Sequence, residues 1–448
     1  MTDRRAPGGW PASAILDLVD DGTVDPRIYS DEGLYALEQE RIFGRAWLLL
    51  CHESQIREPG DYLTTYMGED PVVVARQKDG SIRAFLNQCR HRGMRICRSD
   101  AGSARAFTCS YHGWAYDIGG ALVHVPLEEE AYGTLDKQRW SPLQVAQIAS
   151  YKGLVFATWD PDTPSLEAYL GEATFYMDML FDRTAGGSEA IGGVHNCVIP
   201  CNWKFAAEQF CSDMYHVPIS HLSGITANLP DGTPPEAAEL SREGQQFRAE
   251  WGGHGAGFFV GEGGKPLLAG TIGAEAAGYW FGPSAEAAEH RLGPLRAREM
   301  GAAHMTIFPT CSFLPGVNTV RAWHPRGPHE TEVWAFAVID SDAPAEAKDA
   351  YRKGVLRSFS PAGLFEQDDG ENWVEIQRVL RGHQARRQRF NVQMGMNRPQ
   401  AADERFPGRI GWVFGEEAAR GFYAHWARMM TEESWETLAP AEVRHAAE

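Results

Sequence analysis

The spacing of hydrophobic and polar positions changes along the chain and divides it into stretches of different predicted structure. Residues 31–43 follow Ser30 and repeat apolar side chains at helical intervals, which predicts a capped amphipathic helix. Between about Trp47 and Asp160 the pattern changes to short β-rich runs that are separated by Gly, Pro and Asp. The four clearest runs are YLTTYM, PVVVAR, IRAFLN and LVFATW. This part of the chain is therefore expected to form a small antiparallel β domain.

The rest of the chain mixes helical and strand patterns. Residues 201–216 predict a helix ahead of Pro218, and residues 416–430 repeat apolar positions at helical spacing. The run VWAFAVI at 333–339 predicts a buried strand. Residues 252–273 are rich in glycine, and we expect them to form a loop.

Composition and charge narrow the class of protein. The 448 residues are 43% hydrophobic and 23% charged, which is typical of a globular protein, and roughly 100–200 residues per domain allow two or three domains. A net charge of −18 disfavours nucleic acid and anionic membranes as partners. No apolar run approaches the ~18–20 residues of a membrane span, and the first residues lack the apolar region of a secretory signal. We therefore expect a soluble cytoplasmic protein.

Two cysteines and two histidines form the strongest chemical motif. Cys89-x-His91 and Cys109-x2-His112 are separated by 17 residues, so each half offers one thiolate and one imidazole. Zinc modules usually combine a pair of cysteines with a pair of histidines, and zinc stays an alternative here. The symmetric mixture suits a Rieske [2Fe–2S] cluster, in which two thiolates bind one iron and two imidazoles bind the other.

The neighbours of this motif predict a low reduction potential. Hydrogen bonds to cluster sulfur raise the potential, and high-potential Rieske proteins carry a hydroxyl donor after the second His-Gly pair and a disulfide between the two loops. Here Trp114 follows Gly113, and Tyr111 stands where the second disulfide cysteine would be, so Cys97 has no partner there.

A second motif contains two histidines and a carboxylate. Asp213, His216 and His221 follow the spacing D-x2-H-x4-H, and Pro218 between the histidines can turn the chain so that His221 swings back. Two imidazoles and one carboxylate on one face of iron form the facial triad of oxygen-activating enzymes. The spacing does not decide which carboxylate binds the iron, because Asp213 could instead orient His216. A later acidic run, which could equally be a solvated turn, offers Glu366, Asp368, Asp369 and Glu371.

Both motifs together resemble the large (α) subunit of Rieske non-haem iron ring-hydroxylating dioxygenases over nearly the whole chain. The biphenyl/toluene branch is the most similar, through CNWKFAAEQFCSDMYH, HMTIFPTCSFLP, WHPRGP and FEQDDGENWVEIQ. The resemblance implies an α+β fold, with a small antiparallel β Rieske domain at 46–165 inserted in a helix-covered antiparallel-sheet catalytic domain made of 1–45 and 166–448.

The same resemblance implies a role for each candidate residue. The cluster ligands would be Cys89, His91, Cys109 and His112. The mononuclear iron ligands would be His216, His221 and Asp369, with Asp213 as the bridge that carries electrons from the cluster of a neighbouring subunit. The substrate pocket would be lined by Gln209, Phe210, Met214, Val217, His304, Leu314, Val317, Phe359 and Phe365.

The implied activity is cis-dihydroxylation of an aromatic hydrocarbon by O2. NADH would supply the electrons through a separate reductase and ferredoxin, because the chain has no dinucleotide-binding fingerprint of its own. The assembly would be an α3 trimer or α3β3 with a small β subunit. The four-residue gap between the iron histidines resembles naphthalene and polycyclic enzymes, so a biaryl or fused-ring substrate is favoured. A Rieske monooxygenase and a pure electron-transfer protein are the alternatives.

Overall fold

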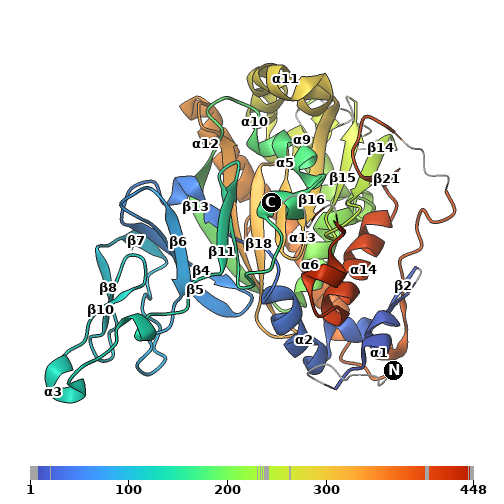
Figure 1. The fold of residues 1–448 in the computed structure, drawn as a ribbon. Helices are drawn as coiled ribbons and strands as arrows, with labels where there is room; N and C mark the ends of the chain where they lie inside the picture. Colours follow the sequence, from blue (N-terminus) through green and yellow to red (C-terminus); the bar gives the residue numbers. More distant parts are fainter. Residues whose placement is uncertain are drawn as a thin grey trace. The chain divides into compact units, whose positions relative to one another are not determined.

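The computed structural model forms two compact units, one made of residues 43–166 and the other of residues 1–42 with 167–448 (Figure 1). The described residues are 9–20, 22–229, 231–232, 234, 236, 242–261, 264–398, 403–441 and 443. Among them, no helix is both long enough and apolar enough to cross a membrane. The first unit is thus an insertion in the sequence of the second.

The inserted unit contains three antiparallel sheets, with strand orders β6-β5-β4-β7, β10-β9-β8 and β11-β12-β3. Strand β5 lies between β6 and β4, and its residues Val72–Ala75 form an unbroken buried run rather than an alternating one, as expected of a strand covered on both faces. The four β-rich runs of the sequence are confirmed as β4, β5, β6 and β12. The elements of this unit are β3 (Leu48–His52), β4 (Asp61–Met67), β5 (Asp70–Arg76), β6 (Ile82–Leu86), β7 (Ala101–Ser103), β8 (Ala106–Thr108), β9 (Ala115–Asp117), β10 (Leu122–His124), α3 (Glu128–Tyr132), β11 (Gln147–Tyr151) and β12 (Leu154–Thr158).

The larger unit is built on an eight-stranded antiparallel sheet of order β13-β19-β18-β17-β16-β15-β14-β21. The predicted strand at 333–339 is confirmed within β19. The strands of this sheet are β13 (Ser188–Ile199), β14 (Gly244–Arg248), β15 (Gly255–Val260), β16 (Met300–Ile307), β17 (Cys311–Leu314), β18 (Thr319–Pro325), β19 (Thr331–Asp340) and β21 (Arg409–Trp412). A separate small sheet consists of β1 (Val19–Asp20), β2 (Thr23–Val24) and β20 (Phe390–Asn391).

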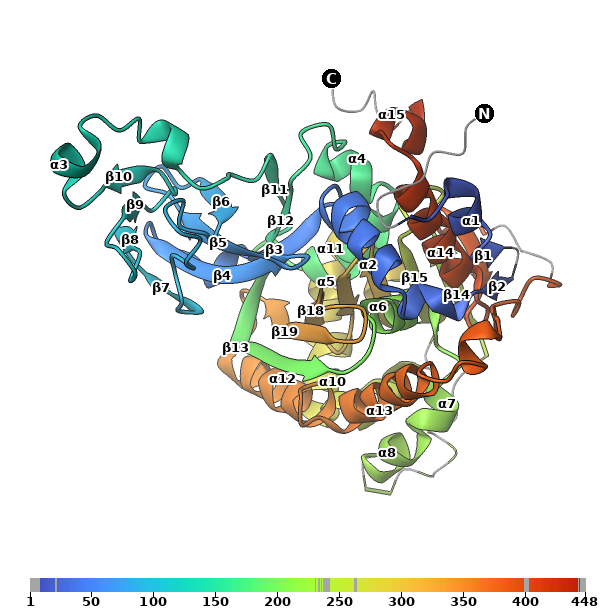
Figure 2. The same cartoon turned by 90° about the horizontal axis from the view of Figure 1, so that it is seen from below.

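Helices cover this sheet: α14 packs on β14 and β15, α6 packs on β15 and β16, and α12 packs on β13 and β19. Figure 2 shows α7 and α8 beside α13, and the Asn372 amide donates to the Ser220 hydroxyl across α13 and α7, at 3.2 Å. The α-helices are α1 (Ala12–Leu16), α2 (Glu32–Glu38), α4 (Leu166–Leu170), α5 (Ala173–Phe181), α6 (Trp203–Ser212), α7 (Val217–Ser220), α8 (Leu222–Ala227), α9 (Gly264–Ile272), α10 (Ala274–Tyr279), α11 (Ala285–Pro294), α12 (Ala345–Ser358), α13 (Leu364–Val379), α14 (Glu417–Thr431) and α15 (Trp435–Leu438).

A buried ion pair anchors the start of α6. The Lys204 ammonium group lies 2.5 Å from Oε1 of Glu38, and both side chains are fully buried. The indole N–H groups of Trp203 and Trp426 also donate to the Glu38 carboxylate, at 2.9 and 2.7 Å. Because both carboxylate oxygens accept hydrogen bonds and the ammonium group is paired with the carboxylate, the charges are tolerated inside the core. The contact ties α2, α6 and α14 together and fixes the helix that leads into the second motif.

Two predicted helices differ in detail from the structure. The helix at 31–43 is confirmed as α2 followed by a π-helical turn, but its cap is Asp31, whose carboxylate accepts from the Leu34 amide, and not Ser30. The helix expected at 201–216 ends at Ser212, because Asp213 adopts extended backbone angles. Asp213 therefore does not share a helical face with His216, and a turn of the chain brings the two together instead.

The expected loop at 252–273 is wrong. This stretch contains strand β15 and helix α9. The glycines of β15 serve close packing: a Cβ at Gly255 would lie 2.5 Å from Sγ of Cys211, and a Cβ at Gly257 would lie 2.5 Å from Nε2 of His304. Glycine inside a strand allows such close approach, and this is what makes the segment look like a loop in sequence.

Candidate metal centres and substrate cavity

The cysteines of the first motif lie on two loops of the inserted unit that are built alike. In each loop the cysteine N–H donates to the carbonyl five residues ahead, in Met94 and Trp114, at 2.8 Å. In each loop a glycine with positive φ, Gly93 or Gly113, returns a hydrogen bond to the cysteine carbonyl. Cys89 and Cys109 are both buried and unbridged, and the His91 and His112 rings are 4.4 Å apart. The sequence motif thus becomes two matched turns that face each other.

The donor set fits a two-iron cluster better than a single zinc ion. A tetrahedral zinc would need all four ligand atoms within about 4 Å of one another, given bonds of about 2.0–2.3 Å. Across the part of the chain that the structure describes, such a convergence of three or more ligand atoms is found at His216, His221 and Asp369 and not at these loops. Nδ1 of His91 is buried without a hydrogen-bond partner, as expected of an atom that would bind iron.

Tyr116 adds a hydrogen bond to this site that sequence reasoning missed. The Tyr116 hydroxyl donates to Sγ of Cys89 at 3.2 Å and accepts from the Arg90 amide at 3.1 Å. The ring is completely buried, and burial together with the Cys89 sulfur raises the pKa of its hydroxyl above the ordinary value of 10. The hydroxyl therefore keeps its proton and remains a donor to the cysteine sulfur.

Replacing Tyr116 by Phe is expected to lower the reduction potential of the cluster. Loss of the hydrogen bond to the Cys89 thiolate destabilises the reduced cluster, which carries more negative charge than the oxidised one. A hydrogen bond of about 1 kcal/mol corresponds to a change in reduction potential on the order of 40 mV for one electron. Redox titration followed by EPR measures the shift. Tyr62→Phe, which removes a hydroxyl elsewhere in the same unit, serves as the control, and equal potentials in wild type and Tyr116→Phe would contradict the assignment.

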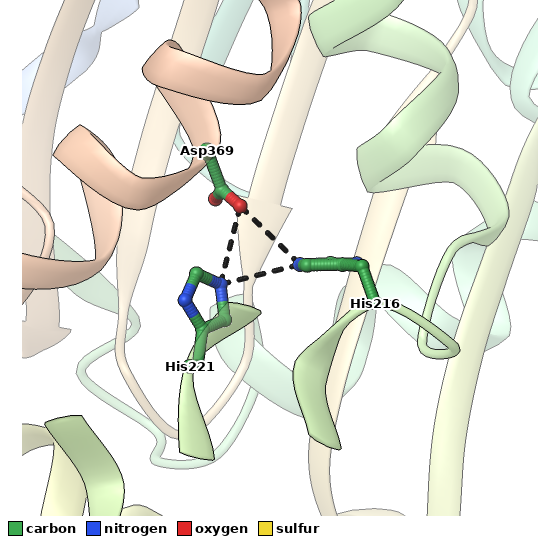
Figure 3. A group of neighbouring side chains, drawn as sticks. All are labelled: His216, His221 and Asp369. Atoms are coloured by element: carbon green, nitrogen blue, oxygen red, sulfur yellow. Dashed lines mark hydrogen bonds and ion pairs between the residues drawn. The ribbon is translucent and has the colours of Figure 1, made fainter. Parts of the chain in front are cut away.

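The second motif places three ligand atoms around one point. His216 caps α7, His221 lies between α7 and α8, and Asp369 projects from α13 toward both rings (Figure 3). The two Nε2 atoms are 3.2 Å apart, and Oδ1 of Asp369 lies 3.3 Å from His216 Nε2 and 3.1 Å from His221 Nε2. Pro218 lies in the first turn of α7, and the chain turns between the two histidines as the sequence predicts.

Two further carboxylates face the other ring nitrogens. Oδ2 of Asp213 lies 3.3 Å from Nδ1 of His216, and Oδ2 of Asp368 lies 3.2 Å from Nδ1 of His221. Carboxylates beside Nδ1 favour a proton there, which leaves both Nε2 lone pairs directed at the Asp369 oxygen. Three lone-pair donors pointing at one another need a cation between them, so the arrangement fits a metal ion with two imidazoles and one carboxylate on one face.

The electrostatics agree with a cation at this point. Burial lowers the pKa of His216, but Asp213 and Asp369 raise it more, to about 10. Burial raises the pKa of Asp369, whereas hydrogen bonds to His216 and His221 lower it well below its usual range. The site therefore holds its carboxylate ionised and attracts one positive charge, which is either a proton or a metal ion.

The acidic run of the sequence is part of α13, and the possible reading as a solvated turn is wrong. Asp369 and Glu366 point into the protein, Asp368 is half-buried, and Glu371 is exposed. Glu366 forms a buried ion pair with Arg321 at 2.7 Å. Helical spacing thus gives neighbouring acids different surroundings, and it is Asp369, rather than Asp213, whose carboxylate lies beside both Nε2 atoms.

Glu208, on α6 before Asp213, is a largely buried acid with a raised pKa. The Ser212 hydroxyl donates to Glu208 at 2.7 Å, and the Tyr423 hydroxyl donates at 3.3 Å. Burial raises the Glu208 pKa to about 8, and the carboxylates of Asp213 and Glu416 act in the same direction. The folded protein therefore binds this proton more tightly than an unfolded chain, whose carboxyl titrates near 4.5.

The stability of the catalytic unit should fall with pH for this reason. The contribution of Glu208 is complete below about pH 4.5 and is lost as the pH rises to about 8. In Glu208→Gln the loss should disappear, so its free energy of unfolding relative to wild type rises between about pH 5 and 8, by an amount on the order of a few kcal/mol. Glu417→Gln is the control: the Glu417 pKa is lowered, mainly by Arg420 and Arg248 working against burial, so its difference from wild type stays constant over this window. Parallel pH profiles for wild type and Glu208→Gln would contradict the assignment.

A cavity opens onto the side chains of His216, His221 and Asp369. All nine side chains assigned to the pocket from sequence lie around it, and so do Asp213, His216, His221 and Asp369. Its surface is mostly apolar, as expected for a site that holds a hydrocarbon. The residues that sequence analysis did not name are Ile225, Leu267, Leu268, Thr271, Ala303 and Pro315.

His304 is a neutral polar group in this apolar wall. Nδ1 of His304 is 2.6 Å from the Phe210 carbonyl, so Nδ1 carries the proton. Burial lowers the pKa of His304 to about 4. The ring thus stays uncharged beside the proposed cation.

Two protein families match this chain over complementary parts. Residues 46–151 match the Rieske [2Fe-2S] domain, and residues 166–432 match the catalytic domain of the ring hydroxylating alpha subunit. These domains imply a Rieske cluster and a non-haem iron, in agreement with the two donor sets.

Relatives and solved structures extend the match to nearly the whole chain. The alpha subunit of biphenyl 2,3-dioxygenase from Rhodococcus jostii RHA1 is 60% identical over 96% of this chain and 94% of its own. Benzene 1,2-dioxygenase subunit alpha from Pseudomonas putida is 60% identical over 96% of both chains. Naphthalene 1,2-dioxygenase with indole bound has the same fold, with a TM-score of 0.85, 34% identity and 96% coverage of both chains. The expected α+β fold is confirmed, and the chain belongs to the alpha subunits of the Rieske non-haem iron ring-hydroxylating dioxygenases.

Proposed function

We propose that this chain is the alpha subunit of a terminal oxygenase that cis-dihydroxylates an aromatic hydrocarbon. The overall reaction consumes an arene, O2, two electrons and two protons and gives a cis-dihydrodiol. The observation that carries the proposal is the apolar cavity that ends on His216, His221 and Asp369. Relatives whose names refer to biphenyl, benzene and chlorobenzene support an aromatic substrate.

In this proposal, Cys89, His91, Cys109 and His112 hold the cluster, and His216, His221 and Asp369 hold the mononuclear iron. When bound, the iron supplies an open face at which O2 can react with a ring beside it. The protein positions the substrate and keeps the site free of water, because the side chains around the cavity bury a flat apolar molecule. Asp213 and Asp368 orient the iron histidines through their Nδ1 atoms.

Electron supply requires partners. The proposal includes NADH as the electron source, with a reductase and a ferredoxin between it and the cluster, and an α3 or α3β3 assembly in the cytoplasm. Electrons pass from the cluster of one subunit to the iron of its neighbour through Asp213. A third of the Asp213 side chain is accessible in the single chain, so a neighbour could reach it.

The substrate preference is a narrower part of the proposal. Biphenyl dioxygenase alpha subunits are among the relatives that are 60% identical, and the four-residue gap between His216 and His221 resembles naphthalene and polycyclic enzymes. We therefore expect biphenyl or naphthalene to be turned over at higher kcat/KM than benzene.

Product analysis tests the function. The purified oxygenase with ferredoxin, reductase and NADH is given benzene, biphenyl or naphthalene under ¹⁸O2. A cis-dihydrodiol with both oxygens labelled is the expected result. A product with one labelled hydroxyl would instead identify a monooxygenase, and electron transfer without any product would identify a carrier.

A further inference from the structure

The side chain of Gln209 lies between an indole and an iron-site histidine. Its Oε1 accepts from the Trp373 indole N–H at 2.7 Å, and its Nε2 is 3.4 Å from Nε2 of His216. Gln209 and Trp373 are both buried, 8% and 2% exposed, so water does not compete for these contacts. The amide therefore has a fixed direction between α13 and the metal centre.

The indole decides which end of the amide faces the metal centre. An indole N–H can only donate, so it must meet the amide oxygen. The NH2 group of Gln209 then has to point toward His216. Without a metal, the NH2 group of Gln209 can donate to the Nε2 lone pair of His216. A metal ion bound at the site would use that lone pair, and the NH2 group would then lack this acceptor.

Trp373 is well placed to hold this direction. It lies one helical turn after Asp369 on α13, so the same face of the helix carries the metal ligand and the indole. Its ring packs edge-to-face on Trp323, with centroids 5.7 Å apart and an angle of 85°. Trp323 is itself fixed, because its indole N–H donates to the Ser312 hydroxyl at 2.8 Å. The Trp373 ring therefore cannot swing away without disturbing the core.

We propose that Trp373 is a positioning residue that aims the Gln209 amide N–H at a ligand on the open side of the mononuclear metal. The remaining cavity wall near the metal is mainly apolar, so a bound anion or oxygen ligand is the acceptor that this donor would meet. The inference rests on the proposed function, because it requires iron at His216, His221 and Asp369.

Azide binding to the oxidised holoenzyme tests the proposal, with the high-spin ferric EPR signal of the mononuclear iron as readout. Trp373→Phe removes the indole N–H and lets the amide turn over, so azide Kd should rise about tenfold, the change expected when a charged ligand loses a hydrogen bond. Gln209→Leu should weaken azide binding by a similar factor. The double variant should be no weaker than Gln209→Leu alone, because Trp373 acts through the amide.

Trp47→Phe is the matched control, since it also removes a buried indole N–H, but one that donates to the Pro164 carbonyl at 2.9 Å within the inserted unit. Its azide affinity should equal that of the wild type. Wild-type affinity in Trp373→Phe, or additive effects in the double variant, would overturn the proposal. Loss of mononuclear iron from Trp373→Phe but not from Trp47→Phe would also overturn it, because the indole would then serve metal retention. Absence of this iron from the wild type would instead refute the proposed function.

Discussion

Replacing Asp369 by Ala is expected to remove the mononuclear iron and to leave the Rieske cluster in place. In the proposed site the Asp369 carboxylate oxygen is the third ligand atom, and without it two imidazoles remain beside a buried cavity. Iron content should fall from about three to about two atoms per chain, and dihydrodiol formation should drop below detection. The EPR signal of the reduced cluster should be unchanged, because its ligands lie in the other unit.

The control for this variant is Glu371→Ala. Glu371 lies two residues further along α13, but its side chain is exposed. It should keep about three iron atoms per chain and normal turnover. Full iron content in Asp369→Ala would contradict the ligand assignment, and Asp213 would then become the candidate for the third position.

Replacing Asp213 by Asn is expected to stop turnover while both metal centres stay loaded. The carboxylate accepts from the His216 backbone amide at 3.1 Å and faces its Nδ1 at 3.3 Å, and asparagine keeps the shape but loses the charge. A fall in kcat of at least about 100-fold is expected, since a bridge between two centres is an all-or-none requirement. When the chemically reduced Asp213→Asn variant is mixed with substrate and O2, its Rieske cluster should stay reduced. Stopped-flow absorbance of the cluster measures this.

Asp368→Asn provides a matched comparison for the bridge. Asp368 makes the same kind of contact with Nδ1 of the other iron histidine, His221, at 3.2 Å. If orientation of a ligand were all that mattered, both variants should lose activity to a similar extent, typically 10–100-fold. Rapid cluster oxidation in Asp213→Asn, or equal losses in the two variants, would contradict the electron-transfer role.

Local patterns in the sequence predicted those parts of the site that are built locally. Cys89, His91, Cys109 and His112 lie on two short turns, so their spacing alone pointed to a cluster. The same holds for His216 and His221 around Pro218, and for the strands whose alternation or burial is visible in single runs. In each case the determining contacts lie within a few residues of one another.

Spacing failed where the answer depends on packing between distant segments. Four acids in 366–371 are equivalent in sequence, and only the orientation of α13 places Asp369 against the histidines. Tyr116, Glu208 and Trp373 were missed because each depends on a contact with another element of the fold. The glycines of β15 were misread because the atoms that require them belong to α6 and β16. The resemblance to a family supplied the Asp369 assignment that spacing left open.

The central claim is that one chain carries a two-iron cluster and a separate mononuclear iron. Quantitative analysis of iron, zinc and acid-labile sulfide in anaerobically purified protein tests it most directly, together with EPR of the reduced sample. The account predicts about three iron atoms and about two sulfides per chain, with the signal of a histidine-ligated cluster. Two iron atoms per chain would reduce the protein to an electron carrier, and zinc without sulfide would contradict the account altogether.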